Sequence, residues 1–235
     1  MRIWDINPGY LNRHSLLGEH RELHGIESII FNKKKGYSNH PETIRWVGYG
    51  WALERRHKQL ACEMALRGYT DRSPVNTGSN LDIWPRKYID EPGRQYQLLR
   101  EKYKDKEEGR IPLPRTAQQL WSQHKYSILA RDLNLYREIG RDAARGQCDF
   151  AELASLLVDT LRIPPKAGGI RNALQHMWGY VSDSKDQNQV DINNGSLKEL
   201  LLEIQKRAKE QKEQYLISST ALSDLMVWLP NAEPG

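Results

Sequence analysis

From Ile111 onward the chain reads as one amphipathic helix after another, and this run constrains the fold more than any other feature. Apolar residues recur at helical spacing, and Pro164-Pro165 with Gly168-Gly169 force a sharp turn between two of the segments. Helices are expected over residues 120–131, 133–145, 150–161, 169–181 and 196–228. No stretch favours a strand and no internal repeat is found, so the pattern predicts an all-α protein.

The N-terminal part also predicts helices. A short extended stretch over residues 2–6 ends in a turn at 7–9, and a helix capped by Asn12 then runs to about Lys33. Pro41 suits the start of a second helical region, and a stronger helix over 51–67 stops at Gly68. Residues 70–96 are rich in Asp, Ser, Pro, Asn, Gly and Arg, and 100–110 is a dense mixed-charge run. We therefore expect two helical domains, residues 1–95 and 96–235, joined by an irregular, polar linker.

The charge balance favours an anionic partner. The net charge is +5 and the pI is about 9.1, which suits nucleic acid, although many housekeeping proteins are mildly basic. Cys62 and Cys148 are too few and too far apart for a disulfide scaffold or a cysteine-based zinc site. No segment approaches the roughly 18 apolar residues of a membrane span, and no apolar signal region follows Met1. We expect a cytoplasmic, nucleoid-associated bacterial protein that contacts no membrane.

Four short blocks near the N-terminus carry a family resemblance. They are Arg2-Ile3, the Gly-Glu-His-Arg-Glu-Leu block at 18–23, the Gly-Tyr-Ser-Asn-His-Pro block at 36–41 and the Leu-Arg-Gly-Tyr block at 66–69. In this order and at these offsets they resemble the pyrimidine-dimer DNA glycosylase family, whose members are similar to endonuclease V of phage. The resemblance covers about residues 1–75.

The resemblance implies a nucleophile and an acid. In that family an N-terminal α-amine attacks the sugar C1′ of the damaged nucleotide and forms a Schiff base, and a helix-borne Glu assists the β-elimination that nicks the strand. Carried to this sequence, the amine belongs to Met1, the acid is Glu22, and Arg2 and Arg21 grip phosphates. In this sequence the Arg-Ile pair directly follows Met1. Because the Arg2 side chain is too bulky for ordinary removal of the preceding methionine, we expect Met1 to be retained. The resemblance implies no cofactor.

Elementary chemistry agrees with this assignment. A free α-amine has a reference pKa of roughly 7.7 to 8.0, so a useful fraction is neutral and nucleophilic at pH 7. Gly18 and Gly25 share a helical face with Glu22, and we expect these small residues to let another backbone approach the carboxylate. Without the resemblance, Glu22 would more simply be a surface carboxylate.

Other residues are candidates for nucleic-acid contacts. Basic side chains could track a DNA backbone, although each one alone could simply be a solubilising charge. Trp46, Tyr49 and Trp51 could stack on an extruded base, but we expect at least Trp51 to belong to the core. The spacing of the histidines at 14, 20 and 40 makes no recognisable zinc site, so we expect no metal, and His20 could instead orient the acid. The predicted nucleic-acid-binding residues are Arg2, Arg21, His14, His20, Lys34, Lys35, His40 and Arg56, and the wider basic set adds Lys33, Arg55, Lys58 and Arg67.

The C-terminal part carries a second resemblance. Blocks at 124–126, 130–132, 136–140, 164–169 and 172–180 look like the bacterial YbgA-type domain of unknown function, and the match runs over about 98–229. The resemblance associates this domain with altered pyrimidines. Lys125, Asn172, Gln175 and His176 could form a base or phosphate site, or Gln175 and His176 could cap buried backbone.

Two functions remain open from the sequence. The first is a DNA repair glycosylase and AP lyase that acts on damaged pyrimidines in duplex DNA. The second is a non-catalytic protein that binds RNA, such as tRNA, or modified pyrimidines. The family's aromatic, lysine-rich C-terminal tail has no match here, which puts specificity for pyrimidine dimers in more doubt than lyase chemistry. The sequence leaves the oligomeric state open.

Overall fold

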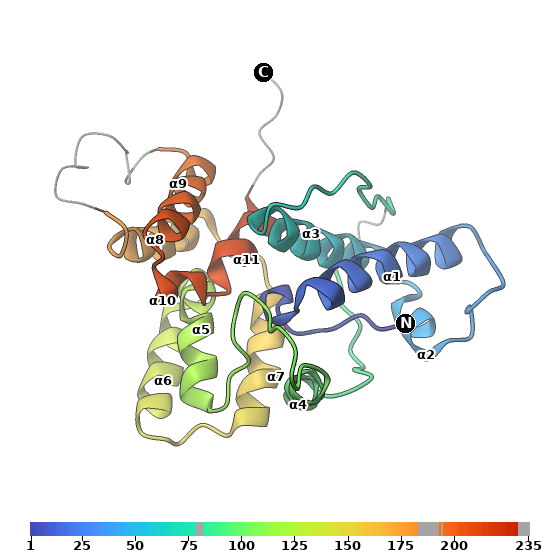
Figure 1. Cartoon of the computed structure of the whole chain (residues 1–235), viewed down its shortest axis with the longest axis horizontal. Helices are drawn as coiled ribbons and strands as arrows, with labels where there is room; N and C mark the ends of the chain where they lie inside the picture. Colours follow the sequence, from blue (N-terminus) through green and yellow to red (C-terminus); the bar gives the residue numbers. More distant parts are fainter. Residues whose placement is uncertain (79–81, 183–192, 194, 230–235) are drawn as a thin grey trace.

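The computed structural model describes residues 1–78, 82–182, 193 and 195–229, and in these residues it contains helices and no strand (Figure 1). This confirms the all-α prediction. None of the helices in these ranges has the length and apolar character that a membrane crossing requires. The elements are η1 (Pro8–Tyr10), α1 (Arg13–Phe31), α2 (Pro41–Trp46), α3 (Gly50–Leu66), α4 (Pro92–Lys102), α5 (Ala117–Leu129), α6 (Leu133–Ala144), α7 (Phe150–Leu161), α8 (Ala167–Trp178), α9 (Leu197–Glu210), α10 (Gln214–Ile217) and α11 (Ala221–Trp228).

Local signals in the sequence set most helix ends. The Asn12 side chain accepts a hydrogen bond from the Ser15 N–H at 2.9 Å, which caps α1 as predicted. Pro41 occupies the first turn of α2, where its missing N–H costs nothing. Gly68 adopts φ +85 just after α3, a conformation that a residue with a side chain rarely takes.

Two predicted segments are wrong. Residues 196–228 do not form one helix but three, because Lys212 takes a positive φ and the Thr220 N–H donates to the Gln123 carbonyl of α5 at 2.9 Å. The mixed-charge run at 100–110 is not a solvated helix or linker throughout, since it includes the end of α4 and the buried side chain of Tyr103. The Tyr103 ring packs in the hydrophobic core, and its hydroxyl is satisfied there by a hydrogen bond that it accepts from the Asn12 N–H at 3.0 Å.

The C-terminal helix α11 lies at the centre of the molecule, where it packs against both α3 and α5 (Figure 1). One cluster of buried apolar side chains runs from Ile3 to Leu161, and a second runs from Leu66 to Leu229. Neither cluster is confined to one of the two predicted domains. The boundary near residue 95 therefore stays a prediction, and the helices on its two sides share hydrophobic contacts.

Candidate active site

The N-terminal segment lies against α1 and is held by side chains rather than by a neighbouring strand. Ile3 and Ile6 are fully buried, which fixes the face that the segment turns to the core. The Trp4 N–H donates to Glu19 Oε1 at 3.2 Å, and the Asp5 N–H donates to Gln95 Oε1 at 2.8 Å. Because these acceptors are buried, the segment has a defined position as far as its first residues.

Beneath this segment Glu19 forms a buried ion pair with Arg56. The Arg56 Nε donates to Glu19 Oε1 at 2.7 Å, and one Nη donates to the Ile6 carbonyl at 2.9 Å. Burial raises the pKa of Glu19 to about 7, although Arg56 and the Trp4 N–H act in the opposite direction. Arg56 as a whole is only 1% exposed, so its guanidinium cannot reach a phosphate in this arrangement. The prediction that Arg56 binds nucleic acid is therefore wrong, because the helix periodicity did not reveal its buried partner.

Asp5 anchors the same segment from the other side. Arg45 binds it through both terminal nitrogens, at 2.6 and 3.1 Å, and an Nη of Arg162 donates to Asp5 Oδ1 at 2.8 Å. Arg162 follows α7, more than 150 positions along the chain. The position of the first residues thus depends on the C-terminal part of the molecule as well as on α1 and α2.

The structure brings Met1 and Glu22 together. The Met1 amine nitrogen lies 4.0 Å from Glu22 Oε1, and the Arg2 N–H donates a hydrogen bond to Glu22 Oε2. The Glu22 side chain is 39% exposed and that of Met1 is 12% exposed. A primary amine and a carboxylate therefore share a site that is open to solvent. The expectation that Gly18 and Gly25 let another backbone approach the carboxylate is wrong, because nothing lies within 4 Å of where a Cβ on either glycine would be.

The two arginines expected at this site differ in their surroundings. Arg2 forms an ion pair with Asp90, and its guanidinium lies 4.4 Å from the centre of the Trp4 ring. Its Nε and other Nη are buried and have no hydrogen-bond partner among the residues that the structure describes. Arg21, which adjoins Glu22 on α1, is exposed. Arg21 therefore presents its guanidinium to solvent, whereas the Arg2 guanidinium is held against Asp90 and Trp4.

Most of the other predicted contacts are dispersed. His14 is exposed at the start of α1, two turns before Glu22, and Lys34 and Lys35 are exposed in the loop after α1. His40 caps α2, since its Nδ1 accepts a hydrogen bond from the Glu42 N–H at 3.1 Å. In the described part of the chain no hydrogen bond or ion pair joins these side chains to Met1 or Glu22.

Arg67 from the wider basic set has a structural role. It donates to Glu63 Oε1 at 2.7 Å and to the Leu11 carbonyl at 2.7 Å, which ties the end of α3 to the N-terminal segment. Its contact with a DNA backbone stays a prediction, and its buried partners are ones that the sequence did not reveal.

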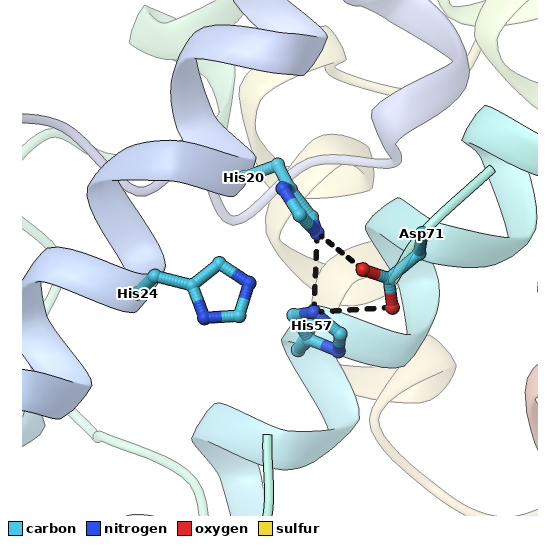
Figure 2. A group of neighbouring side chains, drawn as sticks. All are labelled: His20, His24, His57 and Asp71. Atoms are coloured by element: carbon cyan, nitrogen blue, oxygen red, sulfur yellow. Dashed lines mark hydrogen bonds and ion pairs between the residues drawn. The ribbon is translucent and has the colours of Figure 1, made fainter. Parts of the chain in front are cut away.

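His20 lies two residues before Glu22, on roughly the opposite side of α1, and its side chain belongs to a group that the sequence interpretation missed (Figure 2). Its Nε2 lies 3.2 Å from the Nε2 of His57 and 3.2 Å from Asp71 Oδ1, and His24 completes the group. Burial lowers the pKa of His57 to about 4 and also lowers that of His20. The four-residue spacing of His20 and His24 was the available signal, because it places both imidazoles on one face of α1.

The aromatic side chains divide as well. Trp46 is buried, and its indole N–H donates to Glu42 Oε1 at 3.1 Å, so it belongs to the core. Trp51 is half-buried and packs edge-on against Trp84 with 6.0 Å between ring centres. Of the C-terminal candidates, Gln175 and His176 are exposed, and the Gln175 amide donates to the Asn193 side chain at 3.0 Å rather than to backbone in the described residues.

Comparisons with known families match two separate parts of the chain. Residues 1–77, which hold Met1, Glu22 and the histidine group, match the model of a family described as pyrimidine dimer DNA glycosylase. Residues 125–224 match the model of a family of proteins of unknown function, DUF1722. No curated protein and no solved structure gave a match.

Proposed function

We propose, because residues 1–77 match the model of the pyrimidine dimer DNA glycosylase family, that the chain is a DNA glycosylase with AP-lyase activity on damaged pyrimidines. The observation that carries the proposal is the 4.0 Å separation between the Met1 amine nitrogen and Glu22 Oε1. The proposal requires Met1 to be the first residue of the mature chain, with an unblocked amine. The substrate class is damaged duplex DNA, and the +5 net charge favours that partner.

The reaction begins when the neutral amine attacks C1′ of the damaged nucleotide. A bond forms between the Met1 nitrogen and C1′, and the glycosidic bond breaks with its electron pair leaving on the base. The nitrogen then loses a proton, which the Glu22 carboxylate would accept once the 4.0 Å between the two groups in the free protein closes to hydrogen-bond distance. Transfer of a proton to the sugar ring oxygen opens the ring and leaves a Schiff base between Met1 and C1′.

Strand scission follows from the Schiff base. The iminium acidifies the C2′ hydrogen, so removal of this proton breaks the C3′–O bond and releases the phosphate-bearing strand. Glu22 is the base nearest to the nitrogen, and its exposure lets a sugar reach it. Water then hydrolyses the imine and frees the Met1 amine for another turnover.

Arg2 and Arg21 hold the DNA in this scheme. Arg21 offers an exposed guanidinium from the helix that carries the acid, and Arg2, whose backbone N–H binds Glu22, would exchange its ion pair with Asp90 for a phosphate. Both would contact phosphates, which position the strand without reading its sequence. His14, Lys34 and Lys35 lie farther along the same N-terminal part and would contact only flanking phosphates.

The test is a comparison of two preparations of the full chain on an oligonucleotide duplex with one cyclobutane thymine dimer or one abasic site. Protein with a free Met1 amine should nick both and, with borohydride, form a covalent complex. Protein whose amine is chemically acetylated, or extended by an uncleaved tag, should still bind DNA but form no complex.

Two results would reject the enzyme. Nicking that survives acetylation of the amine would exclude Met1 as the nucleophile. Salt-sensitive binding to an RNA hairpin in preference to the damaged duplex, with no trapped complex, would favour the non-catalytic RNA-binding alternative instead.

A further inference from the structure

Three imidazoles and one carboxylate converge on the side of α1 that faces α3 (Figure 2). His20 and His24 come from α1, His57 comes from α3, and Asp71 follows the end of α3. Glu22 lies two residues from each of the α1 histidines, which places it on roughly the opposite side of the helix. The group is therefore distinct from the proposed active site.

The distances within the group match those between the ligands of one small metal ion. A tetrahedral zinc ion with bonds of about 2.0 to 2.1 Å separates its ligand atoms by roughly 3.3 Å. The His20 and His57 Nε2 atoms are 3.2 Å apart, and they lie 3.2 and 3.5 Å from the two oxygens of Asp71. All four ligand atoms lie within 4.8 Å of one another. His24 would supply the fourth ligand of the tetrahedron.

His24 distinguishes a metal site from a simple hydrogen-bond network. Asp71 alone could accept hydrogen bonds from His20 and His57, but such a network would leave the Nε2 of His24 without a partner. Its Nε2 is buried and has no hydrogen-bond partner in the described part of the chain, and Figure 2 shows a ring nitrogen of His24 pointing toward the other three side chains. Its Nδ1 lies 3.4 Å from Glu27 Oε2. A carboxylate at one ring nitrogen commonly orients a histidine whose other nitrogen binds metal.

We propose that His20, His24, His57 and Asp71 form a structural site for one divalent transition-metal ion, with Zn²⁺ as the best fit. Three nitrogen ligands and one oxygen ligand suit zinc, and four protein ligands leave no open position for a reacting water. The ion would join α1 to α3 and to the segment after α3. It would thereby fix the helix that carries Glu22 without taking part in the chemistry.

The test uses the full chain without a polyhistidine tag, stripped with a chelator and titrated with Zn²⁺ alone in competition with a chromophoric chelator. We expect one equivalent to bind tightly and to raise the melting temperature. Co²⁺ should give the intense visible absorption of a tetrahedral ion. Absence of a stoichiometric site, or a weak octahedral Co²⁺ spectrum, would overturn the proposal.

Variants assign the ligands. His24→Ala should fold, since the side chain is partly exposed, and should weaken Zn²⁺ binding by more than about 100-fold, beyond the 10–100-fold typical of outer-shell losses. His57→Ala should have a similar effect, and Glu27→Gln a smaller one of about tenfold. His14→Ala is the matched control, because it removes an exposed histidine from the same helix and should leave binding unchanged. Equal binding by His24→Ala and the control would overturn the assignment. Because none of these measurements uses DNA, their failure is separate from failure of the proposed enzyme.

Discussion

Glu22 and Glu63 are both helix carboxylates that face nitrogen donors, but their surroundings give them opposite properties. Glu63 is fully buried, and Arg110 binds it through two nitrogens at 2.9 and 2.7 Å while Arg67 donates to it at 2.7 Å. Glu22 is 39% exposed, and its neighbours are the Met1 amine and the Arg2 N–H. One charge is neutralised inside the protein, whereas the other stays accessible to a substrate.

The difference separates stability from reactivity. Arg110 also donates to the Ser219 carbonyl at 3.1 Å, so Glu63 joins α3 to the segment before α11 and thus links the parts that match the two families. A buried carboxylate with two arginines is costly to disturb, because removal of one partner leaves a charge uncompensated. Changes at Glu22 should therefore affect activity alone, and changes around Glu63 should affect folding first.

The largest expected effect is on catalysis, from Glu22→Gln. Loss of the acid should lower the rate of nicking by about 10²- to 10⁴-fold, the usual contribution of a positioned acid or base. The free energy of unfolding should change by no more than about 0.5 kcal/mol, because the side chain is partly exposed. Single-turnover nicking and urea denaturation measure the two quantities. Glu138→Gln, an exposed helix carboxylate far along the chain, is the control. An equal loss of activity in both variants would show that the effect is not specific to Glu22 and would contradict its catalytic role.

The reverse pattern is expected for Arg110→Ala. Glu63 would keep only Arg67, and the free energy of unfolding should fall by about 3 kcal/mol or more. Urea denaturation of this variant and of Arg115→Ala, whose side chain is exposed, gives the comparison. A loss of less than about 1 kcal/mol would show that Glu63 is not a structural link.

A pH series sharpens the same contrast. Burial acts to raise the pKa of Glu63, but Arg110 and Arg67 outweigh it and hold the pKa below the ordinary value of 4.5. The folded protein therefore binds this proton less tightly than the unfolded chain, so the ionised carboxylate stabilises the fold above about pH 4.5. The stability advantage of the wild type over Glu63→Gln should be full at pH 7 and should shrink as the pH falls through the folded pKa. Melting temperatures between pH 7 and 3 test this, and a constant difference would contradict it.

The smallest effect is expected from Arg21→Ala. Removal of one exposed phosphate contact should weaken binding to damaged duplex modestly and reduce the slope of log K against log salt by about 1. Stability should not change. Fluorescence anisotropy at several salt concentrations measures the slope, and an unaltered slope would exclude Arg21 from the DNA contacts.

Local patterns in the sequence predicted most of the helices, but α4 begins at Pro92, inside the stretch that was expected to be irregular. The bounds of α7 were predicted residue for residue. Asn12 caps α1 and Gly68 follows the end of α3, as their residue types predicted. The break between α9 and α11 was missed, because the Thr220 N–H bonds to a carbonyl of α5, nearly 100 positions away. Periodicity within one segment carries no information about such a partner.

The candidate site shows the same limit. Met1 and Glu22 could be paired from the order of the N-terminal blocks, and the structure places them together. Arg56 and Arg67 looked like surface cations, because their buried acceptors come from other segments. His57 and Asp71 could not be joined to His20 from spacing alone, since they lie on a helix and a loop far along the chain.

The most direct measurement is mass spectrometry of the peptides from a borohydride-trapped complex with abasic-site DNA. The account predicts that the sugar remnant is attached to the α-nitrogen of Met1 and that Glu22→Gln lowers its yield. Attachment to the side chain of a lysine, with an unmodified N-terminal peptide, would contradict it.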